Sequence, residues 1–120
     1  MGDRLKEFEG YRARMNERVL EMDNRVIKRV FSVDSLAYTA DGRLPRPTRE
    51  LLGLVASLVL RCDDCVRYHL LEATRTGLEQ EEIIEAMSIG LVVGGTIVVP
   101  HLRRAVEFLD DLADAETAPA

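Results

Sequence analysis

The sequence predicts an all-α protein. Apolar residues recur at steps of three and four along most of the chain, which is the spacing of one face of an α-helix. No segment has a convincing strand pattern, because the β-branched stretch 97–99 is short and Pro100 follows it. With 120 residues, 47% hydrophobic and 31% charged, the composition is that of an ordinary globular protein. We therefore expect one helical domain over residues 1–120, with five to six helices.

The first expected element is a long amphipathic helix over residues 3–31. Its apolar stripe runs from Leu5 to Val33 in steps of three and four without interruption. Ser32 is the candidate N-cap of a second, shorter helix. The turn signal Asp41–Gly42 is expected to end that helix.

The remaining helices are expected to form a core over residues 34–113. Pro45 and Pro47 predict a non-helical segment, after which Thr48 can cap a helix with the apolar body LLGLVASLVL. The further helices that we expect are, in order, residues 66–76, residues 79–89 and a last segment that includes residues 101–112. Residues 114–120 are expected to form a frayed tail.

Charge and hydropathy argue against several kinds of partner. The formal net charge of −5 argues against nucleic acid. The longest apolar stretch, residues 89–100, is too short to span a bilayer, so we expect no membrane segment. Residues 1–10 are charged and unlike a secretory signal, so we expect a cytoplasmic protein. In a reducing cytoplasm, a close pair of cysteines is more often redox-active or metal-binding than structural.

The segment RCDDCVRYH, residues 61–69, holds both cysteines of the chain. Cys62, Cys65 and His69 are spaced by three and four residues, so a helix places them on one face. Residues three apart on a helix have Cα atoms about 5 Å apart, which allows a disulfide to open and close without unfolding. A helix N-terminus stabilises a thiolate, and a histidine one turn beyond Cys65 can act as its base.

Three interpretations of this motif remain open: a redox pair with a base, a metal site that needs a further ligand, and two small buried cysteines beside a polar histidine. Asp63 and Asp64 disfavour a thiolate by their charge. We expect them to point away from the cysteine face and to serve as first-turn helix acids. Tyr68 and His101 are expected at the core, an interface or a helix end.

The segment 50–77, with its C-x-x-C-x-x-x-H pattern, resembles the carboxymuconolactone decarboxylase-like superfamily, in particular its alkylhydroperoxidase D branch. The following string GLEQEEIIEAMSIGLVVGG is also similar, and the resemblance extends over residues 27–108. It implies an alkylhydroperoxidase D-like helical bundle that assembles as a homotrimer or homohexamer. The branch can carry an extra histidine between its cysteines, where this chain has Asp63 and Asp64.

The resemblance also implies an antioxidant enzyme, a thiol-dependent peroxidase or disulfide oxidoreductase with peroxiredoxin activity. Its redox pair would be Cys62 and Cys65, its base His69 and its relay acid Glu50. Its partners would be a hydroperoxide substrate and a dithiol or protein reductant, with no cofactor and no metal. The lactone decarboxylases of the superfamily lack this cysteine pair, which argues against their activity here. A non-enzymatic metal-binding or redox-sensing module is the alternative.

Glu50 can join the cysteines only if the chain folds back on itself. In one straight helix it would lie about 18 Å from Cys62. A turn near Arg61 would instead make two antiparallel helices and bring the acid within reach of the site, directly or through one water. Otherwise Glu50 is a first-turn acid paired with Arg46 or Arg49.

The stripe from Leu5 to Val33 needs something to cover it. The third helix already fills much of a small core, so we expect a homo-oligomer that buries the rest of the stripe. The glycines Gly90, Gly94 and Gly95 either let two helix backbones approach closely or mark a helix boundary.

Overall fold

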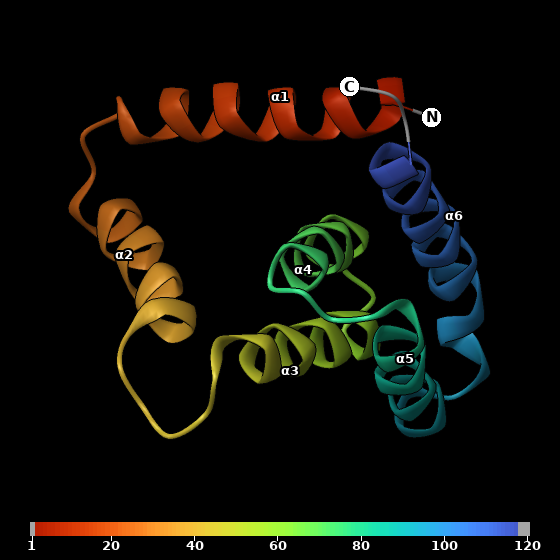
Figure 1. The fold of residues 1–120 in the computed structure, drawn as a ribbon. Helices are drawn as coiled ribbons and strands as arrows, with labels where there is room; N and C mark the ends of the chain where they lie inside the picture. Colours follow the sequence, from red (N-terminus) through yellow and green to blue (C-terminus); the bar gives the residue numbers. More distant parts are fainter. Residues whose placement is uncertain (1, 118–120) are drawn as a thin grey trace.

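A computed structural model describes residues 2–117 and shows a helical protein (Figure 1). Its elements in chain order are α1 (Gly2–Leu20), α2 (Arg25–Thr39), α3 (Arg46–Val59), α4 (Asp63–Arg75), α5 (Gln80–Gly94), the 3-10 turn η1 (Thr96–Val98) and α6 (Val99–Thr117). The expected all-α fold is confirmed, since residues 2–117 contain no strand. No helix within this range is long and apolar enough to cross a membrane.

Helix α4 lies in the middle of the molecule, and α1 runs along one side of it (Figure 1). α2 lies at one end of the molecule, and α5 and α6 lie at the other end. α3 packs most extensively on α4 and α5, and α6 packs on α4. The buried apolar side chains that hold these four helices together come mainly from α3, α4, α5 and α6: Leu54, Leu58, Val66, Leu70, Leu71, Ala73, Ile83, Met87, Val98, Ala105, Phe108, Leu109 and Leu112.

The N-terminal region is two helices, so the single helix expected over residues 3–31 is wrong. α1 ends at Leu20, and α2 begins at Arg25 after a short turn. In that turn Asp23 has a φ of 53°, a left-handed conformation that α-helix excludes. The steps of three and four continue through the turn because each helix has its own apolar stripe, so periodicity alone does not reveal the break.

The start of α2 is set by Asn24, which stands at its N-cap. The Oδ1 atom of Asn24 accepts hydrogen bonds from the backbone N–H groups of Val26 (2.9 Å) and Ile27 (3.1 Å). These are two of the donors that a helix N-terminus leaves without partners. Ser32, the expected cap, is an interior residue of α2 instead.

Helix α2 has no buried residue and is attached to α3 near its C-terminal end. The guanidinium of Arg49 donates to the backbone carbonyls of Ala37 (3.4 Å), Ala40 (2.6 Å) and Leu44 (2.9 Å). One α3 side chain therefore holds the last turn of α2 and the following loop in place.

Other helix ends also differ from expectation. α3 begins at Arg46 with Pro45 as its N-cap, so Pro47 is helical and Thr48 is not the cap. Proline suits the first turn because its missing N–H is not needed there. α6 continues to Thr117, so the tail expected from residue 114 is wrong as far as Thr117, and residues 118–120 lie outside the described part.

Candidate active site

The chain reverses direction between α3 and α4, as the position of Glu50 required. Arg61 has a φ of 62°, in the left-handed region, and the N–H of Cys62 donates to the carbonyl of Ser57 at 3.0 Å. This hydrogen bond closes the end of α3 in the manner of a left-handed C-cap. The expected turn near Arg61 is thus confirmed, and α4 returns along α3.

Cys62 and Cys65 occupy the first turn of α4 and form a disulfide, with their Cα atoms 5.3 Å apart. Cys62 is the N-cap residue, and its sulfur accepts a hydrogen bond from the backbone N–H of Cys65 at 3.2 Å. Both cysteines are partly buried. The sulfur atoms therefore lie where unpaired N–H groups and the helix dipole favour negative charge, which is the environment that lowers the pKa of a thiol.

Glu50 and His69 form a buried pair between α3 and α4. The Nδ1 atom of His69 lies 2.9 Å from Oε1 of Glu50, and the side chain of Glu50 is fully buried. Because a carboxylate can only accept, Nδ1 carries the hydrogen in this contact. The second carboxylate oxygen, Oε2, makes no hydrogen bond and lies 3.6 Å from Nε of Arg46.

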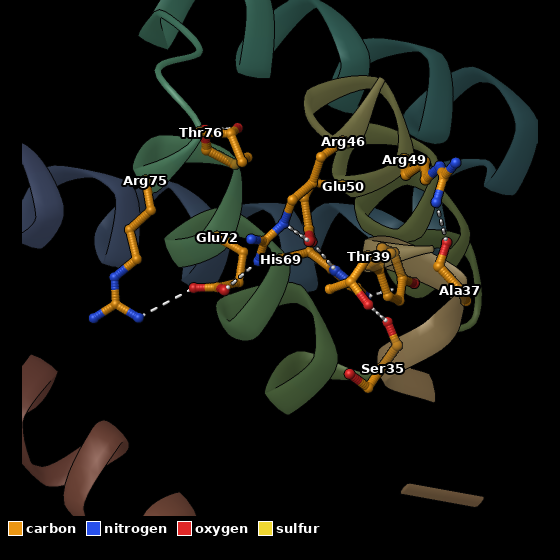
Figure 2. A network of polar contacts seen from close by, with 12 residues as sticks. Ser35, Ala37, Thr39, Arg46, Arg49, Glu50, His69, Glu72, Arg75 and Thr76 are labelled. Atoms are coloured by element: carbon orange, nitrogen blue, oxygen red, sulfur yellow. Dashed lines mark hydrogen bonds and ion pairs between the residues drawn. The ribbon is translucent and has the colours of Figure 1, made fainter. Parts of the chain in front are cut away.

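Arg46 connects this buried pair to the protein surface, as Figure 2 shows. Its second contact is Glu72, at 2.9 Å, and Glu72 in turn binds Arg75 at 3.1 Å. A buried carboxylate is costly unless hydrogen-bond donors or positive groups stand beside it. Here the imidazole donates a hydrogen bond and the guanidinium brings a positive charge. Of the two arginines expected beside Glu50, Arg46 is the partner and Arg49 is not.

Tyr38, at the end of α2, contacts the opposite side of the imidazole. Its hydroxyl lies 3.3 Å from Nε2 of His69, and the two ring centroids are 5.0 Å apart. The hydrogen bonds of His69 thus go to Glu50 and Tyr38 while the cysteines are joined as a disulfide. Sequence reasoning missed Tyr38, because no spacing rule links a residue on α2 to the histidine 31 positions later.

The two acids between the cysteines are both in ion pairs. Asp63 binds His101 (2.8 Å) and Arg104 (2.7 Å) of α6, and Asp64 binds Arg12 of α1 (2.6 Å). Burial works to raise the pKa of Asp63, but hydrogen bonds from His101 and Arg104 outweigh it and hold the pKa below its ordinary value. Their positions as first-turn acids are confirmed, and the pairing offsets their charge near the sulfur atoms.

The sequence pattern of the carboxymuconolactone decarboxylase family matches residues 26–108, more than half of the chain. The chain belongs to the carboxymuconolactone decarboxylase family. The match begins in α2, ends in α6 and includes Tyr38, Glu50, both cysteines and His69, whereas α1 lies outside it.

Solved structures of the carboxymuconolactone decarboxylase family share this fold. A Thermotoga maritima protein has a TM-score of 0.89 and 53% identity, over 92% of this chain and 96% of that one. A second crystal structure from T. maritima, with a TM-score of 0.88 and 52% identity, covers 92% and 93%. That family member is suggested to take part in an antioxidative response. A Legionella pneumophila member, at 22% identity and a TM-score of 0.64, covers 92% and 90% and shows the fold alone.

Two curated relatives of this family member are described as uncharacterized proteins. One, from Cupriavidus necator, is 32% identical over 76 residues, which are 63% of this chain and 67% of that protein. Another, from the cox locus of Paracoccus denitrificans, is 29% identical over 76 residues, or 63% and 68% of the two chains. The comparisons therefore give the family and the fold, and the chemistry has to be argued from the residues of the site.

Proposed function

We propose that this protein is a thiol-dependent peroxidase, a disulfide oxidoreductase that reduces hydroperoxides through Cys62 and Cys65. The observation that carries the proposal is the buried contact of 2.9 Å between Glu50 of α3 and His69 of α4, the helix whose first turn holds the cysteine pair. An acid–base pair beside two thiols is what peroxide reduction needs. The antioxidative role suggested for the T. maritima relative supports the same chemistry.

The proposed reaction has three steps. The thiolate of Cys65 attacks the terminal oxygen of the hydroperoxide, an S–O bond forms, the O–O bond breaks, and the leaving alkoxide takes a proton to become an alcohol. The thiol of Cys62 then attacks the sulfenic acid of Cys65, forming the disulfide and releasing water. A dithiol reductant supplies two electrons by thiol–disulfide exchange and restores both thiols.

His69 and Glu50 handle the proton in the first step. His69 lies one helical turn beyond Cys65. We therefore assign it two roles: it removes the proton from the Cys65 thiol, and it later gives a proton to the leaving alkoxide. Glu50 holds the hydrogen on Nδ1 and offsets the charge of the imidazolium that forms. Cys62, at the N-cap, is the sulfur that we expect to meet the reductant.

Peroxide consumption with a dithiol donor such as reduced lipoamide tests this function directly. Replacing either Cys62 or Cys65 by Ser should abolish turnover and disulfide formation, while circular dichroism should show nearly unchanged helix content. The chain has only these two cysteines, so no other thiol can substitute. Full activity in both single variants would refute the mechanism.

A metal-binding module is the competing function, and metal analysis separates the two. Among residues 2–117, no three or more His, Cys, Asp or Glu side chains are grouped so as to hold a metal ion. Protein purified without chelator should therefore hold no stoichiometric zinc. Zinc bound at one equivalent per chain would overturn the peroxidase proposal.

We also propose that the protein works as a homo-oligomer, a trimer or hexamer, in the cytoplasm. Support comes from large apolar side chains that remain exposed on α2 and around the end of α5: Val26, Val30, Val33, Leu36, Ile89, Val92, Val93 and Ile97. Apolar surface of this extent is typical of a surface that another chain covers. A reducing cytoplasm would return the cysteine pair to its dithiol form between turnovers.

A further inference from the structure

We propose that Tyr38 is a positioning residue that completes the proton relay and connects it to solvent. The inference rests on the proposed peroxidase function and deepens it. The relay would run from Glu50 through His69 to the hydroxyl of Tyr38, and from there into a pocket beside α2.

The first support is the geometry of the imidazole. Nδ1 of His69 faces Glu50 at 2.9 Å and Nε2 faces the Tyr38 hydroxyl at 3.3 Å. With the hydrogen of neutral His69 held on Nδ1 by the carboxylate, Nε2 is an acceptor, and the hydroxyl of Tyr38 can donate to it. Nε2 is thus the nitrogen that gains and loses the proton, and Tyr38 is its hydrogen-bond partner.

The second support is Gly53, whose lack of a side chain leaves room for the contact between Tyr38 and His69. A Cβ on Gly53 would come within 2.6 Å of the Tyr38 hydroxyl oxygen, 2.7 Å of His69 Cε1 and 2.8 Å of His69 Nε2. Real Cβ atoms do not approach other atoms this closely, so any larger residue would force the tyrosine, the histidine or the helix to move. Gly53 lies inside α3 and does not have a positive φ, so its backbone conformation does not require glycine. Glycine is required there because the Tyr38 and His69 side chains come so close to its Cα.

The third support is that Tyr38 is held from both sides along the chain. Arg49 donates to the carbonyl of Ala37, immediately before Tyr38, and to that of Ala40, two residues after it. Helix α2 has no buried residue, so these hydrogen bonds, not core packing, fix the last turn. Glu50, which orients His69, and Arg49, which anchors the last turn of α2, both come from α3, so one helix helps to define the distance between Tyr38 and His69.

The protonation state of Tyr38 suits this role. Burial, followed by the negative charges of Asp34 and Glu50 and by the neighbouring Tyr68, raises the pKa of Tyr38. The group is therefore a neutral phenol at neutral pH and can donate a hydrogen bond. When Nε2 carries a proton, the phenol oxygen can accept instead, so the same contact serves both states of the imidazole.

A proton can pass through Tyr38 without changing it. The N–H bond at Nε2 breaks, a new O–H bond forms on the phenol oxygen, and the original phenol hydrogen leaves to an acceptor on the other side. That acceptor is water or the alkoxide released from the hydroperoxide. Tyr38 ends the step as the same neutral phenol, so the atoms and charges balance.

The pocket that would receive the proton lies between α1, α2 and α4. It has a volume of about 420 Å³, and Tyr38 is part of its wall, together with Arg12, Asn16, Phe31, Arg46 and Tyr68. Tyr38 thus belongs to two environments, the buried pair on one side and this pocket on the other. Tyr68 shares the pocket and contacts the edge of the His69 ring, with centroids 5.3 Å apart, but the hydrogen bond to His69 comes from Tyr38.

The test compares Tyr38→Phe with the matched control Tyr68→Phe. Each removes one hydroxyl from the same pocket and keeps the ring. The rate of thiol oxidation by a hydroperoxide, measured in reduced protein from pH 5 to 9, should fall about tenfold in Tyr38→Phe, since water can partly replace a shuttle. Its pH profile should shift as well. Tyr68→Phe removes no hydrogen bond to His69, so it should change the rate and the profile less than Tyr38→Phe does.

A second measurement does not depend on enzyme activity. Nitrogen-15 spectra of the His69 ring report which nitrogen carries hydrogen and at what pH the ring titrates. The chain has two histidines, so one His101→Gln variant assigns the signals. Tyr38→Phe should change the Nε2 signal of His69, because it removes the hydroxyl that faces this nitrogen, and Tyr68→Phe should not.

The outcomes separate this inference from the proposed function. If wild-type protein does not consume hydroperoxide, the peroxidase proposal fails, and an Nε2 signal altered only by Tyr38→Phe still supports the positioning role. If wild type is active and Tyr38→Phe keeps its rate, its pH profile and the His69 signals, the role of Tyr38 is overturned. Equal effects of both tyrosine variants would also overturn it.

Discussion

Glu50 is the residue on which the geometry of the site depends most. Its carboxyl group is fully buried between α3 and α4, and its charge partners are His69 and Arg46. Removing a partner from a buried charge is expensive, because the remaining charge has neither water nor a counter-ion. The pair therefore holds the imidazole in one orientation and also keeps the two helices in register.

We expect His69→Gln and Glu50→Gln each to lower the rate of thiol oxidation by about 10²-fold, the usual effect of a lost general base. Stopped-flow measurement of the reduced protein with hydroperoxide gives this rate. Glu72→Gln is the matched control, because Glu72 belongs to the same network through Arg46 and Arg75, whereas the hydrogen bonds of His69 go to Glu50 and Tyr38. If Glu50→Gln oxidises its thiols at the wild-type rate, Glu50 has a structural role and no role in proton transfer.

Asp63 gives a prediction for pH. Its pKa is held below the ordinary 3.8 by His101 and Arg104. A carboxyl group with a lowered folded-state pKa adds stability above its unfolded pKa and loses it as the pH falls through the folded value. The stability lost in Arg104→Gln should therefore be full above about pH 4 and should shrink toward zero in stronger acid.

Urea unfolding of wild type and Arg104→Gln at several pH values measures this difference. The exposed neighbour Arg103 provides the control, and Arg103→Gln should give a small difference that does not change between pH 2 and 7. If the difference in unfolding free energy between wild type and Arg104→Gln is as large at the lowest pH as at neutral pH, the pairing of Asp63 with Arg104 is not its source.

Single residues of the site were predictable to different degrees. Cys62, Cys65 and His69 follow from local spacing alone, because they lie on one helix. Glu50 follows from family resemblance together with the need for a turn, and the structure supplies that turn at Arg61. Tyr38 does not follow from either, since its contact depends on how α2 packs against α3.

At the scale of elements, the helical class was predictable and several boundaries were not. Periodicity reports which face of a segment is apolar, and it cannot detect a turn that preserves the steps, as between α1 and α2. The Asp23–Asn24 pair was the available signal, because Asn is a favoured N-cap. Similarly, Pro45 and Pro47 read as a break, whereas Pro45 caps α3 and Pro47 fits its first turn.

Asn24→Ala tests whether the cap fixes the start of α2. Losing a side-chain cap costs about 1 kcal/mol of folding stability, and Asn24 accepts two backbone hydrogen bonds. Urea unfolding should show a loss of that size, while Asn24→Asp, which keeps an acceptor oxygen, should stay close to wild type. Unchanged stability in Asn24→Ala would mean that tertiary contacts, not the cap, define the helix.

For the molecule as a whole, the expected N-terminal stripe separates into two parts. On α1, Leu5 and Phe8 pack against the core, and the ring of Phe8 lies 5.3 Å from that of Phe108. On α2, Val30 and Val33 remain more than half exposed. The surface that the proposed oligomer would cover is thus that of α2, together with the apolar end of α5.

We expect light scattering at micromolar concentration to give a mass that is a multiple of 13.5 kDa. Val33→Asp on α2 and Val92→Asp on α5 should each lower that mass, because a buried unpaired charge opposes association. Val106→Asp, on the exposed side of α6, is the control and should leave the mass unchanged. A single species near 13.5 kDa in the wild type would contradict the oligomer.

Cys62 is also the N-cap residue of α4, so the proposed mechanism would link electron transfer to backbone order. In the dithiol form a thiolate there would accept the Cys65 N–H as a charged partner, and charge-assisted hydrogen bonds are roughly twice as strong as neutral ones. By linkage, whatever stabilises the first turn of α4 favours the reduced protein, and gaining two electrons should in turn slow amide exchange at Cys65. Variants that loosen this turn should make the pair a stronger reductant. In the proposed mechanism the helix start would therefore be part of the redox couple.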